Sequence, residues 1–137
     1  MVVVDTSVWV DVFRDKSGKT GRALEAWLNG RDVFLTHFNQ LELLQGCRDE
    51  KEWNLLASYL DNQDYLVMAP ESWPAAARIY FDLRRKGLTV CSPIDCCIAQ
   101  LSMRHKMLLL HNDGDFEVIA SVRPLQQLRY LPRGTTE

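Results

Sequence analysis

The sequence contains no apolar run that approaches the roughly 20 residues of a membrane-spanning helix, so we expect no transmembrane segment. Its first residues, MVVVDTSVW, have no basic region and no small-residue cleavage site, which argues against a secretory signal peptide. None of the four cysteines belongs to a C-x-x-C pair, so we expect free thiols and no zinc site. These absences predict a cytoplasmic protein.

The chain also lacks repeats, low-complexity tracts and a phosphate-binding loop of the G-x-x-x-x-G-K type. Its net charge of -2 argues against a general polyanion binder. With 137 residues, 47% of them hydrophobic and 25% charged, it has the composition of one globular domain. We expect that domain over residues 1–131 and a flexible tail at 132–137.

What the chain does have is an alternation of strand and helix patterns. Apolar runs predict strands at 1–5, 32–37, 64–70 and 107–111, with a last edge strand at 125–131. Helical patterns lie between them at 8–13, 23–30, 39–47, 50–62, 71–87, 92–106 and 115–122, and the polar segment 14–22 is predicted to be a loop. This order predicts an α/β fold, a three-layer α/β/α sandwich around a central, mostly parallel sheet of four to five strands.

Acidic residues follow the predicted strands or open the helices after them. Asp5 ends the first strand, Glu42 and Asp95 lie in first turns of helices, and Asp113 and Asp115 follow the fourth strand. In a parallel α/β sheet all these points lie at one edge, where such folds place their functional crevice. Carboxylates gathered there repel one another and resist ionising together. A hard cation relieves that repulsion, and oxygen ligands favour Mg²⁺ or Mn²⁺ over zinc.

Helix capping is the competing explanation for these acids. Three pairs have the spacing of a capping box: Asn39 with Glu42, Ser92 with Asp95, and Asn112 with Asp115. Taken one at a time, capping explains each pair, and an acid in the first turn also suits the helix dipole. Asp5 fits this explanation less well, because Thr6 and Ser7 already offer a cap. The occurrence of acids at every strand exit favours the metal site.

The segments DTS, LELLQG, SPIDCCIAQ and LLLHNDGDFEVI occur in the order and spacing of the PIN-domain nucleases, and the chain most resembles the VapC toxins among them. The resemblance spans Met1 to about Val122. It implies a magnesium-dependent endoribonuclease, with Mn²⁺ as a substitute ion, that cuts structured RNA such as tRNA or rRNA and so inhibits translation. It also implies a cognate antitoxin as partner, and a homodimer, or a heterotetramer or larger assembly with the antitoxin.

The same resemblance implies the site residues. The catalytic acids would be Asp5, Glu42, Asp95 and Asp113, and the metal ligands Asp5, Asp95, Asp113 and Asp115. Glu42 would orient or deprotonate the attacking water or hold the metal through water. The fourth acid could be Asp113 or Asp115. His111 stands where relatives often carry a small hydroxyl residue, and we expect it to face solvent.

RNA affinity must come from cations and hydroxyls around the acids. The candidate substrate-binding residues are Thr6, Ser7, Arg14, Lys16, Lys19 and Arg22. Two further basic clusters, at 84–86 and 104–106, end helices, where positive charge complements the dipole, and we favour that interpretation for both. The apolar helices at 53–60 and 73–81 carry more apolar surface than one small domain buries, which suggests a homodimer or an antitoxin groove.

Two other functions remain open. A receiver-like signalling domain also binds magnesium with acids at strand ends, but it expects a lysine after a later strand, and none occupies that place. A non-catalytic PIN-like scaffold would bind RNA or protein without cutting it, and loss of acids would mark it.

Overall fold

The computed structural model describes residues 1–89 and 92–130. In these residues a single sheet holds five strands in the order β3-β2-β1-β4-β5, and every neighbouring pair is parallel. The strands are β1 (Val2–Val4), β2 (Val33–Thr36), β3 (Asp64–Leu66), β4 (Leu108–His111) and β5 (Gln127–Arg129). The predicted parallel sheet is therefore confirmed, including its edge strand near the C-terminus.

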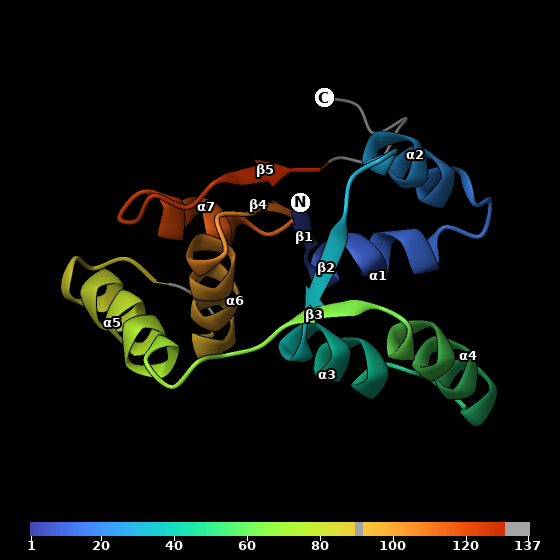
Figure 1. Cartoon of the computed structure of the whole chain (residues 1–137), viewed down its shortest axis with the longest axis horizontal. Coiled ribbons are helices and arrows are strands. Elements are labelled where there is room, and N and C mark those ends of the chain that lie inside the picture. The colour runs from blue at the N-terminus through green and yellow to red at the C-terminus, as the bar shows by residue number, and fades with distance from the viewer. Residues whose placement is uncertain (90–91, 131–137) are drawn as a thin grey trace.

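Helices cover both faces of this sheet (Figure 1). The helices are α1 (Thr6–Arg14), α2 (Lys19–Leu28), α3 (His37–Gln45), α4 (Glu50–Asp61), α5 (Ser72–Arg85), α6 (Pro93–Arg104) and α7 (Gly114–Ala120). Helices α1 to α4 lie on one side and α5 to α7 on the other, which is the predicted three-layer α/β/α arrangement. Within the described residues, no helix is long and apolar enough to cross a bilayer.

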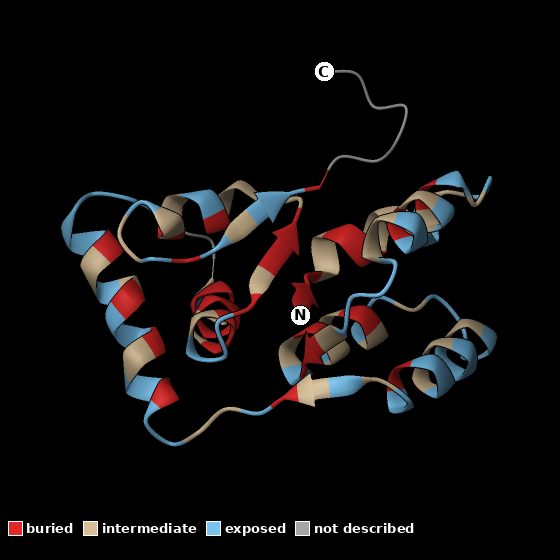
Figure 2. Ribbon diagram, turned by 45° about the horizontal axis from the view of Figure 1, so that its top comes forward, coloured by how far each residue is buried: buried red, intermediate tan, exposed pale blue. Residues whose placement is uncertain are grey.

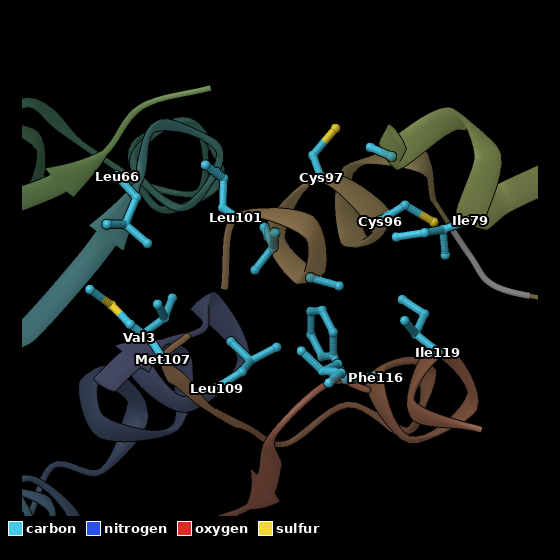
Figure 3. Packing of buried hydrophobic residues seen from close by; sticks show 14 of the residues in the cluster. Val3, Leu66, Ile79, Cys96, Cys97, Leu101, Met107, Leu109, Phe116 and Ile119 are labelled. Atoms are coloured by element: carbon cyan, nitrogen blue, oxygen red, sulfur yellow. The ribbon is translucent and has the colours of Figure 1, made fainter. Parts of the chain in front are cut away.

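The central strand β1 is buried on both faces, and its successive side chains point alternately to the two helical layers. Val3 packs with the helices α5 to α7, whereas Val2 and Val4 pack with α1 to α4. Figure 2 shows β1 and the last residues of β4 as buried. Figure 3 shows the first of these clusters, in which Leu109 of β4 and Phe116 of α7 lie beneath α6. An uninterrupted apolar strand is thus the expected sequence for this place.

Helix α2 begins at Lys19, so the prediction of a loop over residues 14–22 is wrong in its second half. The residue before the helix, Gly18, has a left-handed φ of 77° and offers no side-chain cap. Asp15 supplies the cap from a distance: its Oδ2 accepts from the backbone N–H of Thr20 at 2.7 Å. A helix start capped from outside its own N-terminal residue leaves no usual sequence signal.

Two expectations fall partly outside the described residues. The predicted tail at 132–137 lies outside the described residues, and so does one of the four cysteines, Cys91. Cys47, Cys96 and Cys97 are described, and all three are free thiols, as predicted.

Candidate active site

Asp5 lies where β1 ends and α1 begins, and only 4% of its surface is exposed. It is itself the N-cap of α1, so the expectation that Thr6 or Ser7 caps this helix is wrong. Its Oδ2 accepts from the backbone N–H of Ser7 at 3.0 Å and from the Ser7 hydroxyl at 2.6 Å. Burial raises the pKa of Asp5 in spite of these hydrogen bonds, and the charge of Asp113 raises it further.

Asn39 joins Asp5 to the second acid, Glu42. Its side-chain Nδ2 donates to Thr6 Oγ1 at 3.0 Å and approaches Asp5 Oδ1 at 3.4 Å. Because Thr6 Oγ1 accepts from Asn39, its own proton points to Glu42, whose Oε1 accepts it at 2.8 Å. Sequence analysis treated Asn39 only as a helix cap, but the cap of α3 is Thr36 and Asn39 lies at its third position. The Thr-x-x-Asn spacing is the signal that could have identified this network.

Three carboxylates form the centre of the site. Oxygens of Asp95, Asp113 and Asp115 all lie within 4.8 Å of one another. Burial raises the pKa of Asp95 to about 8, with further contributions from the charges of Asp113, Asp5 and Asp115 and from a hydrogen bond with Asp115. Near neutral pH this group therefore holds a proton, or a cation in its place.

The predicted capping pairs do not explain the acids of this centre. Ser92 caps α6, as predicted, but its Oγ accepts from the N–H of Ile94 at 2.9 Å and not from Asp95. The cap of α7 is Asp113, whose Oδ1 accepts from Asp115 N–H at 3.0 Å, and not Asn112. Asp113 is therefore both a helix cap and a member of the acidic cluster. Capping does not account for Asp95.

His111 is fully buried, so the expectation that it faces solvent is wrong. The parallel pairing of β4 with β5 covers it, because the edge strand places Gln127 beside its ring. His111 Nδ1 accepts from the backbone N–H of Asp113 at 3.1 Å, and Nε2 lies 2.7 Å from Gln127 Oε1. Neither contact was predicted. The local sequence pattern does not show which side chain of the last strand packs against His111.

The neighbouring Asn112 connects the end of β4 to α1. Its backbone N–H donates to the Ser7 hydroxyl at 2.9 Å, and its Nδ2 donates to Asp11 Oδ2 at 2.7 Å. The Ser7 hydroxyl in turn donates to Asp5. Two acids that lie more than a hundred residues apart, Asp5 and Asp113, are thereby held in one hydrogen-bonded frame.

Glu42 lies at the border between the acidic cluster and a groove. Burial raises its pKa, the hydrogen bond from Thr6 lowers it, and the charges of Asp5 and Asp113 raise it. The groove has a volume of about 780 Å³ and lies between α1, α3 and α4. Its apolar wall includes Phe13, with 51% of its surface exposed. Glu42 therefore faces two environments, one acidic and one apolar.

The predicted substrate-binding residues divide into groups. Thr6 and Ser7 lie among the acids. Arg14 and Lys16 line the groove together with Glu42. The remaining two residues, Lys19 and Arg22, lie on α2, where the Arg22 guanidinium donates to the Ser17 carbonyl at 3.4 Å.

The donor set consists of carboxylate oxygens, three of them close enough to hold one ion, and this suits a hard divalent cation. Asp5 and Glu42 lie outside that group of three but act on it electrostatically. Burial is the main cause of the raised pKa of Asp95, and a bound cation would relieve the repulsion by Asp113, Asp5 and Asp115 that adds to it.

The family model of the PIN domain matches residues 2–122. The chain belongs to the PIN domain family. Among curated proteins, it is 33% identical over 129 residues to the VapC ribonuclease Mb1587 of Mycobacterium bovis and to the ribonuclease VapC11 of Mycobacterium tuberculosis. Each match covers 92% of this chain and 96% of the relative. Family membership excludes the receiver-like alternative.

Solved structures show the same PIN fold. The structure of VapBC2 from Rickettsia felis, bound to a DNA fragment from its promoter, includes a chain that matches with a TM-score of 0.74 at 16% identity, covering 95% of this chain and 99% of that one. The DNA-bound VapBC of Salmonella typhimurium matches with a TM-score of 0.76 at 16% identity, covering 93% and 96%. At such identities the likeness concerns the PIN fold alone.

Proposed function

We propose that this PIN domain is a magnesium-dependent endoribonuclease and the toxin of a toxin–antitoxin pair. The observation that carries the proposal is the group of Asp95, Asp113 and Asp115 at the carboxyl edge of a parallel sheet, with Asp5 and Glu42 beside it. The names of the relatives support it, because proteins 33% identical over nearly the whole chain are called VapC ribonucleases. The presence of the full set of acids speaks against a non-catalytic scaffold.

Asp95, Asp113 and Asp115 would hold the ion, with Asp5 as the fourth ligand. A bound Mg²⁺, or Mn²⁺ in its place, lowers the pKa of a coordinated water and stabilises negative charge on phosphate oxygens. The frame of Ser7 and Asn112 keeps Asp5 turned toward the other acids. His111 fixes the backbone at Asp113, the N-cap of α7, and hence the first turn of α7, which contains Asp115.

Glu42 would orient the attacking water and accept its proton. Its raised pKa brings it closer to neutral pH, where a general base works best. The hydrogen bond from Thr6 occupies Oε1 and leaves Oε2 for the water. Asn39 sets the direction of that hydrogen bond, so it acts as a positioning residue for Glu42.

The substrate we propose is structured RNA such as tRNA or rRNA, whose cleavage inhibits translation in the cytoplasm. Thr6 and Ser7 would support the phosphate site through Glu42 and Asp5, which accept hydrogen bonds from their hydroxyls. The cations Arg14 and Lys16 would bind the backbone that enters along the groove. We assign Lys19 and Arg22 to more distant phosphates on the α2 side.

The partner we propose is a cognate antitoxin, since the solved structures of matching fold include VapBC complexes. The groove beside Glu42 offers it exposed apolar side chains, among them Phe13, Leu55 and Tyr59. A segment bound there would cover Glu42 and block access to the acids. We also propose a homodimer, or a heterotetramer or larger assembly with the antitoxin.

The test compares partner-free wild type with Asp95→Asn and with Asp61→Asn, a matched change of an exposed aspartate at the end of α4. Each protein is incubated with tRNA and rRNA, with Mg²⁺ or with EDTA. We expect cleavage by wild type and Asp61→Asn in Mg²⁺ only, and a loss of at least about a hundredfold in Asp95→Asn. Equal cleavage by Asp95→Asn and wild type would overturn the proposal. Intact RNA with all proteins would favour a binding scaffold.

A further inference from the structure

Helices α5 and α6 run antiparallel, which brings the end of α5 to the start of α6. The ion pair between Arg104, in the last turn of α6, and Glu71, the N-cap of α5, fixes one end of this hairpin at 3.0 Å. The other end therefore brings the last turns of α5 toward the first turn of α6, which contains Asp95, and Ile79 of α5 lies beside Cys96 of α6 (Figure 3). Arg123, just after the end of α7, donates to Asp82 in α5 at 2.7 Å and ties the last turns of α5 to α7.

The last turn of α5 and its C-cap carry three consecutive cations, the α5 basic cluster (Arg84, Arg85 and Lys86). All three residues are exposed, and none forms an ion pair with any residue of 1–89 or 92–130. Asp82, the nearest acid along the helix, already pairs with Arg78 and Arg123 and does not neutralise them. Within the described part of the chain, the cluster is thus an unpaired positive patch at the end of the hairpin where α6 begins.

The side chain of Arg85 is partly ordered by an aromatic neighbour. Its guanidinium carbon lies 5.6 Å from the centre of the Phe81 ring, within the range of a cation–π contact. Such a contact uses the flat face of the guanidinium and leaves its N–H groups available for bidentate binding of a phosphate. Arg85 is therefore better prepared to hold a phosphate than a freely rotating surface cation.

We infer that the α5 basic cluster binds the phosphate backbone of the RNA on the α5–α7 side of the acidic site, opposite Arg14 and Lys16 on the α1 side. This inference rests on the proposed function. An RNA strand approaching the carboxylates is repelled by them, and the whole chain has a net charge of -2, so attraction must come from cations close to the site. Cations on both flanks would hold the strand across the acids.

The chain contains its own control for this inference. The α6 basic cluster (Arg104, His105 and Lys106) also ends a helix, so the dipole acts on both clusters alike. It lies at the opposite edge of the sheet, because α6 runs away from Asp95 and its end leads directly into the start of β4. If only the helix dipole explained these cations, the two clusters would behave alike toward RNA.

The experiment compares Arg84→Gln/Lys86→Gln with Arg104→Gln/Lys106→Gln, two variants with the same residue types, spacing and change of charge. The second variant also removes the ion pair between Arg104 and Glu71. Binding of a fluorescein-labelled RNA stem-loop is measured by anisotropy over a range of salt, with every protein in an Asp95→Asn background so that the RNA stays intact. We expect the α5 variant to bind about tenfold more weakly and to lower the slope of log K against log salt by about one to two. We expect the α6 variant to stay within about twofold of its parent.

Equal losses in both variants would show an effect of net charge alone, and no loss in the α5 variant would show that RNA does not contact this cluster; either result overturns the inference. Cleavage is measured in parallel with Asp95 intact. Wild-type cleavage together with an unchanged KM in the α5 variant would overturn the inference and leave the proposed function standing. Absence of both cleavage and RNA binding in the wild type would overturn both. Thermal melting of each variant verifies that it is folded.

Discussion

The backbone N–H of Asp113 donates to Nδ1 of His111 at 3.1 Å. Since Nδ1 accepts, the ring proton is on Nε2, which donates to Oε1 of Gln127 at 2.7 Å. The edge strand β5 therefore selects the tautomer of a buried histidine that in turn positions an acid of the site. Ligands held by such outer contacts depend on them for their orientation.

Gln127→Leu is expected to weaken metal binding although Gln127 is not itself a proposed ligand. Without its acceptor, His111 can adopt the other tautomer, whose Nδ1 proton would face the N–H of Asp113. We expect the affinity for Mn²⁺, measured by calorimetry, to fall by about tenfold. Gln126→Leu, which changes an exposed neighbour of the same type, should leave the affinity unchanged. Unchanged binding in Gln127→Leu would show that β5 has no part in positioning Asp113.

The metal-free protein is expected to lose stability as the pH rises, and Asp95→Asn to relieve that loss. The folded-state pKa of Asp95, about 8, lies above its ordinary value of 3.8. Its contribution to the free energy of unfolding is therefore complete below about pH 4 and lost as the pH rises through about 8. We expect the Tm of Asp95→Asn to exceed that of wild type by a margin that grows between these values and is constant above them.

Asp61→Asn is the control for these Tm measurements. It also replaces a carboxylate by an amide, but at an exposed position. Adding Mg²⁺ at pH 8 should raise the Tm of wild type and of this control but not that of Asp95→Asn, because a ligand that binds only the folded state stabilises it. A margin that does not change with pH would mean that Asp95 is ionised in the folded metal-free protein.

Thr6→Val is expected to slow cleavage by roughly tenfold, since it removes the donor that orients a general base. The substitution keeps the shape of the side chain but removes the donor to Glu42 Oε1, and it leaves Asn39 Nδ2 only its long contact of 3.4 Å with Asp5 Oδ1. Leaving buried polar groups unpaired should also cost about 1–3 kcal/mol of stability. Thr6→Ser, which keeps the hydroxyl, should retain most of the activity in the same RNA assay. Full activity in Thr6→Val would exclude the proposed role of Thr6 in orienting Glu42.

Phe116→Ala is expected to lower stability by about 3–5 kcal/mol, because Phe116 is fully buried and its loss leaves a cavity. Its ring centre also lies 5.2 Å from that of His111, so the cavity would open beside the acid loop. Urea denaturation measures the change, and Phe116→Leu should cost markedly less because it fills most of the space. A cost below about 1 kcal/mol would indicate that the site collapses around the missing ring.

The sequence predicted the sheet well, because a parallel strand buried on both faces leaves an unmistakable apolar run such as MVVVD. It also located the acids, since their places follow from the order of strands and helices. Helix starts were less accessible. Thr36 and Asp113 cap helices for which Asn39 and Asn112 had been expected, because a shift of one to three residues exchanges one polar side chain for another.

The contacts that join the acids to distant parts of the chain could not be predicted. His111 is buried by Gln127, Asp5 is held by Asn39, and each of these contacts joins segments that are distant in sequence. Local patterns report periodicity and propensity, whereas these contacts depend on the register with which neighbouring strands and helices come together. They are consequences of the tertiary fold.

The pairing of β1 with β4 has a consequence during synthesis on the ribosome. Val4 pairs with Leu110, so β1 cannot complete its pairing in the sheet until β4 has been translated, more than a hundred residues later. Asp113 and Asp115 follow that strand. A nascent chain or a truncated product that stops before β4 thus has Asp5, Glu42 and Asp95 but no complete set of acids. The acidic site is therefore incomplete until β4 and the two acids after it have been added to the chain.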